Sequence, residues 1–161
     1  MGRRWIVVDT NIFCFTGYQE AGDHGRRERD YLAKGGEAVD FLHRLMEYCD
    51  EYGLAVDTGG LIVEEYQRQI PLGSFGHYAF RQMATRMPGK VRAFDPRNPD
   101  WMDQVARSQD LDKHDRRFIA TALATPDKVL VSEDTVLLEN APFLERKGLH
   151  VYDAEEANEV L

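Results

Sequence analysis

Short apolar runs alternate with longer amphipathic segments along this chain. The apolar runs lie at residues 5–8 (WIVV), 54–57 (LAVD), 91–94 (VRAF), 128–132 (KVLVS) and 149–152 (LHVY). Runs of this length, bounded by polar or turn-forming residues, are typical of strands. We therefore expect five strands, and the near-continuous apolar character of the runs favours a parallel sheet covered on both faces.

The longer segments carry apolar residues at helical spacing. In residues 36–53, five apolar side chains fall on one helical face, and Gly53 fits a helix stop. Further helices are expected at 59–70, 76–87, 99–108, 112–124 and 154–161. Because strands and helices alternate, we predict an α/β protein: a three-layer α/β/α sandwich with a central parallel sheet of about five strands. A single domain is expected to span residues 1–161.

Composition narrows the class of protein. The chain has 161 residues, 28 acidic and 20 basic, with a net charge of −8. This excess of acidic residues argues against a protein that binds nucleic acid over its whole surface, because Lys and Arg are needed to neutralise the phosphates. Two cysteines, Cys14 and Cys49, are too few for a disulfide framework or a thiolate zinc site. The run at 5–8 is too short for a signal peptide and no segment reaches transmembrane length, so a cytoplasmic protein without membrane association is expected.

Two carboxylates stand where predicted strands end. Asp9 directly follows the first apolar run, and Asp134 lies two residues beyond the fourth. In open α/β sheets, ligands bind outside the carboxyl ends of the strands. Because burying a carboxylate costs several kcal/mol unless it is paired or binds a metal, two of them at matching strand ends indicate a site.

The predicted helices supply further acids. Asp112 and Asp115 are three positions apart and therefore share a helical face. In 59–70, Glu65 flanks the apolar stripe while Glu64 points nearer to solvent, so Glu65 is the better candidate for a cleft. A cluster of four carboxylates would repel itself unless some were protonated or a hard cation such as Mg²⁺ or Mn²⁺ bound there. Such a metal ion activates water and stabilises charge on a phosphate.

Four segments carry a family resemblance. They are VVDTNIF (7–13), VEEY (63–66), DRRFIATAL (115–123) and VLVSEDT (129–135). In order and spacing they resemble the signature segments of PIN-domain ribonucleases, the family that includes the VapC toxins. The closing residues 148–161 resemble the last strand and helix of that family.

The resemblance implies roles for particular residues. Asp9, Glu65, Asp115 and Asp134 match the metal-binding, catalytic carboxylates of the family, with Mg²⁺ or Mn²⁺ as cofactor. Two polar residues, Asn11 and Ser132, match family positions that orient the site. The implied activity is metal-dependent hydrolysis of RNA phosphodiester bonds. The implied partners are RNA, an antitoxin protein if the chain is a toxin, and a second copy in a homodimer.

One position departs from the pattern. Where the family often has a further acid, two positions past the last one, this chain has Val136. The neighbouring Glu133 should project the other way from an extended chain. A single held ion is therefore expected rather than two.

The basic residues and histidines give weaker signals. Arg26, Arg27, Arg68 and Arg116 are candidates for phosphate contacts, although each also fits a solvated surface. The five histidines show no ligand spacing, so no role is assigned to them. The segment 16–36, which is rich in glycine and charge, is expected to be a loop or a frayed helix.

Structural alternatives exist for the acids. Asp9 also fits a helix N-cap, Asp112 with Asp115 fits a capping box, and Glu64 fits an ion pair with Arg68 four residues later.

Two alternative functions remain open. One is a catalytically inactive PIN-like module that binds RNA or protein. The other is a phosphatase of the haloacid-dehalogenase type, which also begins with a strand ending in Asp. That motif needs a second Asp two residues later, where this chain has Asn11.

Overall fold

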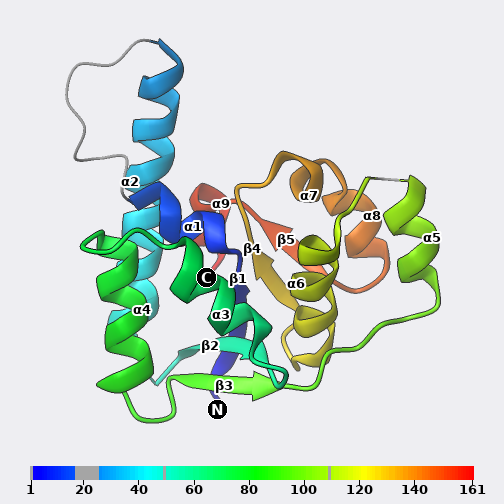
Figure 1. Cartoon of the computed structure of the whole chain (residues 1–161), viewed down its shortest axis with the longest axis horizontal. Coiled ribbons are helices and arrows are strands. Elements are labelled where there is room, and N and C mark those ends of the chain that lie inside the picture. Colours follow the sequence, from blue (N-terminus) through cyan, green and yellow to red (C-terminus); the bar gives the residue numbers. More distant parts are fainter. Residues whose placement is uncertain (1, 17–25, 49, 109) are drawn as a thin grey trace.

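Five parallel strands form the centre of the molecule (Figure 1). The computed structural model describes residues 2–16, 26–48, 50–108 and 110–161, with only the backbone described for 26–32 and 108. The strands are β1 (Arg4–Val8), β2 (Tyr52–Asp57), β3 (Val91–Phe94), β4 (Val129–Val131) and β5 (His150–Tyr152). Their order in the sheet is β3-β2-β1-β4-β5, and all neighbours run parallel. The five predicted strands and the α/β class are therefore confirmed.

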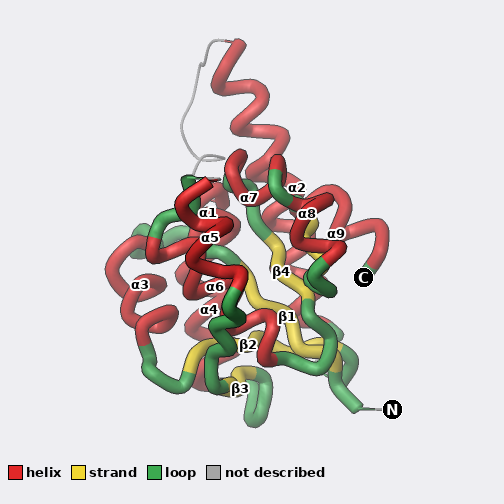
Figure 2. Tube along the Cα trace, turned by 90° about the vertical axis from the view of Figure 1, so that its right-hand side faces the viewer, coloured by secondary structure: helices red, strands yellow, loops and turns green. Residues whose placement is uncertain are grey.

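Helices cover both faces of this sheet. They are α1 (Thr10–Phe15), α2 (Arg26–Glu47), α3 (Leu61–Gln69), α4 (Phe75–Thr85), α5 (Trp101–Ser108), α6 (Lys113–Ala124), α7 (Thr135–Glu139), α8 (Ala141–Arg146) and α9 (Ala154–Val160). Helix α6 packs across β1, β2 and β4, whereas α2 packs on β2 and α9 lies against α2 and β5. The strands thus lie between helical layers, as the predicted three-layer sandwich requires (Figure 2). In the described part of the chain, no helix is long and apolar enough to cross a membrane.

The predicted stop at Gly53 is wrong. Helix α2 ends at Glu47, and Gly53 instead lies inside β2, where it pairs with Trp5 of β1. A Cβ atom at this position would come within 2.5 Å of the Trp5 ring. The glycine therefore makes room for an aromatic ring on the neighbouring strand. Of the segment 16–36, residues 26–36 belong to α2, and residues 17–25 lie outside the described part of the chain.

The direction of the chain through the sheet reverses beside β1. The chain runs from β1 through β2 to β3 on one side, and then crosses to β4 and β5 on the other. Residues 6–8 of β1 and the whole of β4 are buried, which suits strands covered on both faces. The carboxyl ends of β1 and β4 therefore lie at the topological switch point, the usual place for a ligand in such sheets.

Helix α1 turns immediately after β1 and is fixed by its apolar side. Phe13 is fully buried, and its ring lies 4.8 Å from that of Tyr66 and 6.2 Å from that of Phe80. The Tyr66 hydroxyl donates to the carbonyl of Val8. These contacts hold the beginning of α1 and the adjoining end of β1 in place.

Candidate active site

A cleft of about 350 Å³ opens at the carboxyl ends of β1 and β4. The four predicted carboxylates, Asp9, Glu65, Asp115 and Asp134, all line it. They come from four segments: the end of β1, helix α3, the first turn of α6 and the residue before α7. The fold therefore brings the four predicted acids to one place.

Asp9 is the most buried of these acids. Its backbone N–H donates to Val131 of β4 (2.8 Å), and its carboxylate accepts a hydrogen bond from the Ser132 hydroxyl (2.6 Å). Burial raises the pKa of Asp9 to about 7, and the negative charges of Asp115, Asp134 and Glu65 contribute to this rise. The hydrogen bond from Ser132 opposes it. Asp9 stands at the N-cap position of α1, yet its side chain makes no capping hydrogen bond. The N-cap interpretation therefore does not account for this carboxylate.

Ser132 connects two of the acids. Its hydroxyl donates to Asp9 and accepts the backbone N–H of Asp134 at 2.9 Å. Asp134 in turn caps α7 by accepting the N–H of Leu137 at 3.1 Å. One buried hydroxyl thus sets the relative position of the ends of β1 and β4.

Asn11 holds the segment that follows β4. Its side-chain oxygen accepts the backbone N–H of Glu133 at 3.2 Å. The Glu133 side chain points away from the cleft, where it accepts the N–H of Ala154 (2.9 Å) and lies 3.7 Å from the Lys34 ammonium. Val136 packs against the hydrophobic core. The predicted direction of Glu133 is therefore confirmed.

Asp115 has both a capping and a cleft position. Asp112 and Asp115 form the predicted capping box at the start of α6, with Asp112 accepting the N–H of Asp115 at 2.9 Å. Burial, followed by the charges of Asp112 and Asp134, raises the pKa of Asp115 to about 6, against the opposing hydrogen bond from the Asp112 backbone. The same carboxyl group therefore caps the start of α6 and contributes negative charge to the cleft.

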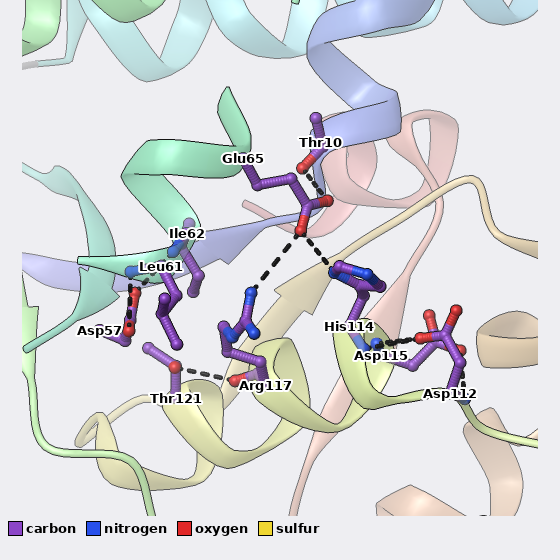
Figure 3. A network of polar contacts seen from close by, with 10 residues as sticks. All are labelled: Thr10, Asp57, Leu61, Ile62, Glu65, Asp112, His114, Asp115, Arg117 and Thr121. Atoms are coloured by element: carbon purple, nitrogen blue, oxygen red, sulfur yellow. Dashed lines mark hydrogen bonds and ion pairs between the residues drawn. The ribbon is translucent and has the colours of Figure 1, made fainter. Parts of the chain in front are cut away.

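Three donors surround Glu65 (Figure 3). The Thr10 hydroxyl donates to one carboxylate oxygen at 2.7 Å, and the other oxygen lies 3.1 Å from Nδ1 of His114 and 3.9 Å from Nη1 of Arg117. Thr10 and His114 also line the cleft. Neither residue was assigned a role from the sequence. The one available signal for His114 is its place in the first turn of α6, next to Asp115.

The exposed neighbour Glu64 behaves as the helical pattern predicts. Its side chain is exposed, whereas that of Glu65 is only 12% exposed. In the described ranges there is no ion pair between Glu64 and Arg68, so the predicted pairing is not observed.

The candidate phosphate-binding arginines separate into three places. Arg68 lines the cleft, whereas Arg116 lines a different hollow beside α6. Arg26 and Arg27 begin α2, and their side chains lie outside the described part of the chain.

Each of the four acids accepts at least one hydrogen bond from a protein donor. Within the ranges that the structure describes, no three His, Cys, Asp or Glu side chains form a group that would hold a metal ion as they stand. A metal ion would therefore have to draw these side chains together. No family model matches the chain, and no curated protein or solved structure matches it either.

Replacing Ser132 by alanine is expected to lower the free energy of unfolding by about 2 kcal/mol. The change removes a hydrogen bond to a charged group and leaves the Asp134 N–H without its acceptor. Any Mn²⁺ bound in the cleft should also be held more weakly, because Asp9 and Asp134 lose their common support. Urea unfolding and calorimetric Mn²⁺ titration measure the two effects.

Ser74→Ala provides the matched control. Ser74 caps α4 by accepting the N–H of His77, so its loss should cost about 1 kcal/mol of stability. Ser74 does not line the cleft, and Mn²⁺ affinity should stay at the wild-type value. Equal effects of both variants on Mn²⁺ binding would show that Ser132 acts only through overall stability.

Proposed function

We propose that this protein is a metal-dependent endoribonuclease of the PIN-domain class. The observation that carries the proposal is the convergence of Asp9, Glu65, Asp115 and Asp134 on one cleft at the switch point of the sheet. These residues are up to 125 positions apart in sequence, from 9 to 134. They are also the residues at which the sequence resembles the PIN ribonucleases.

The electrostatics of the cleft support a bound cation. Two of its acids, Asp9 and Asp115, have a pKa raised to about 7 and about 6 because they are buried near other negative charges. A divalent cation would offset this repulsion and favour the ionised forms. The candidate ligands are carboxylate oxygens, which suit Mg²⁺ and Mn²⁺ rather than softer metals. The residues present therefore fit the proposed cofactor.

The residues of the cleft would have two roles, metal binding and the positioning of the metal-binding carboxylates. Asp9, Asp115 and Asp134 would hold the metal, with Glu65 as a further ligand. When bound, Mg²⁺ or Mn²⁺ supplies an activated water and stabilises negative charge on the phosphate. Ser132 fixes the carboxylate of Asp9.

Thr10 and His114 hold the remaining acid, Glu65, in the cleft. Such support by neighbouring donors keeps a carboxylate oriented toward a metal.

The same resemblance supports a cellular role. A PIN ribonuclease would act in the cytoplasm, either as a toxin restrained by an antitoxin or as a free-standing RNA-processing enzyme, and would form a homodimer. These partners are part of the proposal.

An inactive PIN-like binding module is the main alternative. It is favoured by the finding that, among the described residues, the cleft acids are not grouped for a metal as they stand. For the phosphatase alternative, the position of the required second acid is taken by Asn11, whose side chain accepts the N–H of Glu133. A neutral amide in that place cannot serve as a general acid.

Cleavage of a mixed-sequence RNA tests the proposal. Purified protein should cut the RNA with Mn²⁺ and stop cutting when EDTA is added, and Asp115→Asn should lower the rate at least 100-fold. Asp40→Asn, on an exposed carboxylate of α2, is the matched control and should retain the wild-type rate. A nuclease activity that is equal in the Asp115→Asn protein would point to a contaminant and contradict the proposal.

A further inference from the structure

Helix α6 separates two hollows of opposite charge. His114 and Asp115 face the acidic cleft. Lys113, Arg116 and Arg117 line a second hollow of about 350 Å³. Because positions i, i+3 and i+4 share a helical face, the three cations project from one side of α6, whereas His114 and Asp115 line the cleft on the other. We call the second hollow the basic groove.

The basic groove is also lined by a loop that is hydrogen-bonded to α6. Pro96 and Asn98 line it from the segment between β3 and α5. This loop is joined to α6 by the backbone N–H of Arg97, which donates to the carbonyl of Ala120 at 2.9 Å. The groove is therefore bounded by a helix on one side and by a tethered loop on the other.

The charge of the groove is positive. Among the described residues that line it, Asp57 is the single carboxylate, against three cationic side chains. Asp57 is only 3% exposed, and it already accepts the backbone N–H groups of Leu61 (3.1 Å) and Ile62 (2.8 Å). The Asp57 carboxylate is therefore already hydrogen-bonded to the first turn of α3.

Arg116 has donor capacity to spare. Its Nε is buried, and within the described ranges it has no hydrogen-bond partner. Its Nη1 lies 3.5 Å from Asp103, but that carboxylate is 77% exposed, so solvent screens the pair. A buried donor without an acceptor is unfavourable. Because the Arg116 side chain is 39% exposed, its guanidinium can turn to offer this donor to a ligand oxygen.

Arg117 connects the groove to the cleft. It reaches from α6 toward Glu65 of α3, with 3.9 Å between Nη1 and the carboxylate (Figure 3). A chain of anionic groups that enters the cleft would therefore find cations directly beside it. The protein carries a net charge of −8, so a local basic surface is needed for it to hold a polyanion at all.

We propose that the basic groove binds a backbone phosphate of the RNA strand that neighbours the phosphate in the acidic cleft. This inference rests on the proposed function and names how the substrate is held. The guanidinium of Arg116 and the ammonium of Lys113 bind the phosphate oxygens, since both groups are donors suited to phosphate. Contacts of this kind carry affinity without base sequence.

Binding of a short, fluorescein-labelled single-stranded RNA in EDTA tests the inference. Anisotropy of the double variant Lys113→Ala/Arg116→Ala should show affinity about 30-fold weaker at moderate salt, with a shallower dependence of log Kd on log salt. Arg117 is left unchanged because it contacts Glu65. The matched control is Arg81→Ala/Arg86→Ala, which removes two exposed cations at α4 and should change affinity by less than twofold.

Two outcomes of the RNA-binding experiment would overturn the inference. One is equal weakening by both double variants, which would show that RNA responds only to net charge. The other is the absence of RNA binding by the wild-type protein at low salt. Circular dichroism and an unchanged Mn²⁺ affinity would show that the Lys113→Ala/Arg116→Ala protein is folded.

The test separates the groove from the nuclease proposal. RNA affinity that depends on Lys113 and Arg116, without any Mn²⁺-dependent cleavage, would support the groove and contradict the nuclease function. Mn²⁺-dependent cleavage whose KM is the same in wild type and in the double variant would support the nuclease and overturn the groove.

Discussion

Replacing Asp9 by asparagine is expected to stabilise the metal-free protein and to abolish its stabilisation by Mn²⁺. A rise in the pKa of Asp9 from 3.8 to about 7 means that the folded protein holds this carboxylate ionised at a cost of about 4 kcal/mol at pH 8. Asparagine removes the charge and keeps an oxygen that can accept the Ser132 hydrogen bond. The free energy of unfolding should therefore rise by about 2–4 kcal/mol, part of the gain being lost to imperfect packing of the amide.

Urea unfolding at pH 8, with EDTA and with excess Mn²⁺, measures both effects. The wild-type protein should gain stability with Mn²⁺, because a ligand that binds the folded state shifts the equilibrium by mass action. The Asp9→Asn protein should start higher and gain nothing. Asp103→Asn should match the wild type in both conditions, since its side chain is 77% exposed. An Asp9→Asn protein that is less stable than the wild type in EDTA would show that the carboxylate stabilises the fold.

Mn²⁺ affinity is expected to fall about 100-fold between pH 8 and pH 5.5. Carboxylates must lose their protons to bind a metal, and Asp9 and Asp115 have pKa values of about 7 and about 6 in the metal-free fold. At pH 5.5, protonation of Asp9 should weaken binding about 30-fold, and protonation of Asp115 about fourfold more. Calorimetric titration across this range measures the change.

Proton release provides the internal control for this prediction. Titration at pH 6 in two buffers of different ionisation enthalpy should show that between one and two protons leave on binding. An affinity that is constant from pH 8 to pH 5.5, with no proton release, would place the metal away from Asp9 and Asp115.

The same pKa values fix the sign of the stability change in the metal-free protein. Between pH 4 and pH 7, Asp9 is ionised in the unfolded chain but protonated in the fold, so the folded state binds more protons. The contribution of Asp9 to stability is therefore most favourable below about pH 4 and is lost as the pH rises through about 7.

The parts of the fold that follow from local pattern were predictable from the sequence. The apolar runs that became β1 and β4 are continuous because both strands are buried on both faces. Three of the shortest helices were not among the helices expected from the sequence. Helices α1, α7 and α8 have only five or six residues, too few for a helical period to show. Gly53 was misread because a glycine that makes room for Trp5 looks, in sequence, like a glycine that ends a helix.

In the candidate site, too, a residue could be predicted where a local pattern marks it, but not where its role comes from contacts with distant residues. Asp9 and Asp134 were found because each follows an apolar run, and a parallel sheet places such ends at one edge. Thr10 and His114 were missed because their roles come from contacts with Glu65, which lies 55 and 49 positions away. The basic groove has a similar origin. The spacing of Lys113, Arg116 and Arg117 is visible in sequence, but the loop that faces them is not.

Calorimetric titration of Mn²⁺ at pH 8 into wild-type, Asp134→Asn and Glu64→Gln proteins shows whether the cleft acids bind a metal ion. Asparagine at 134 still caps α7, and Glu64 is an exposed neighbour of the cleft acid Glu65. Mn²⁺ should bind to the wild type and to Glu64→Gln, and binding should be lost in Asp134→Asn. Equal binding by all three proteins, or no binding by a folded wild type at millimolar Mn²⁺, would contradict a metal site at the carboxyl ends of β1 and β4.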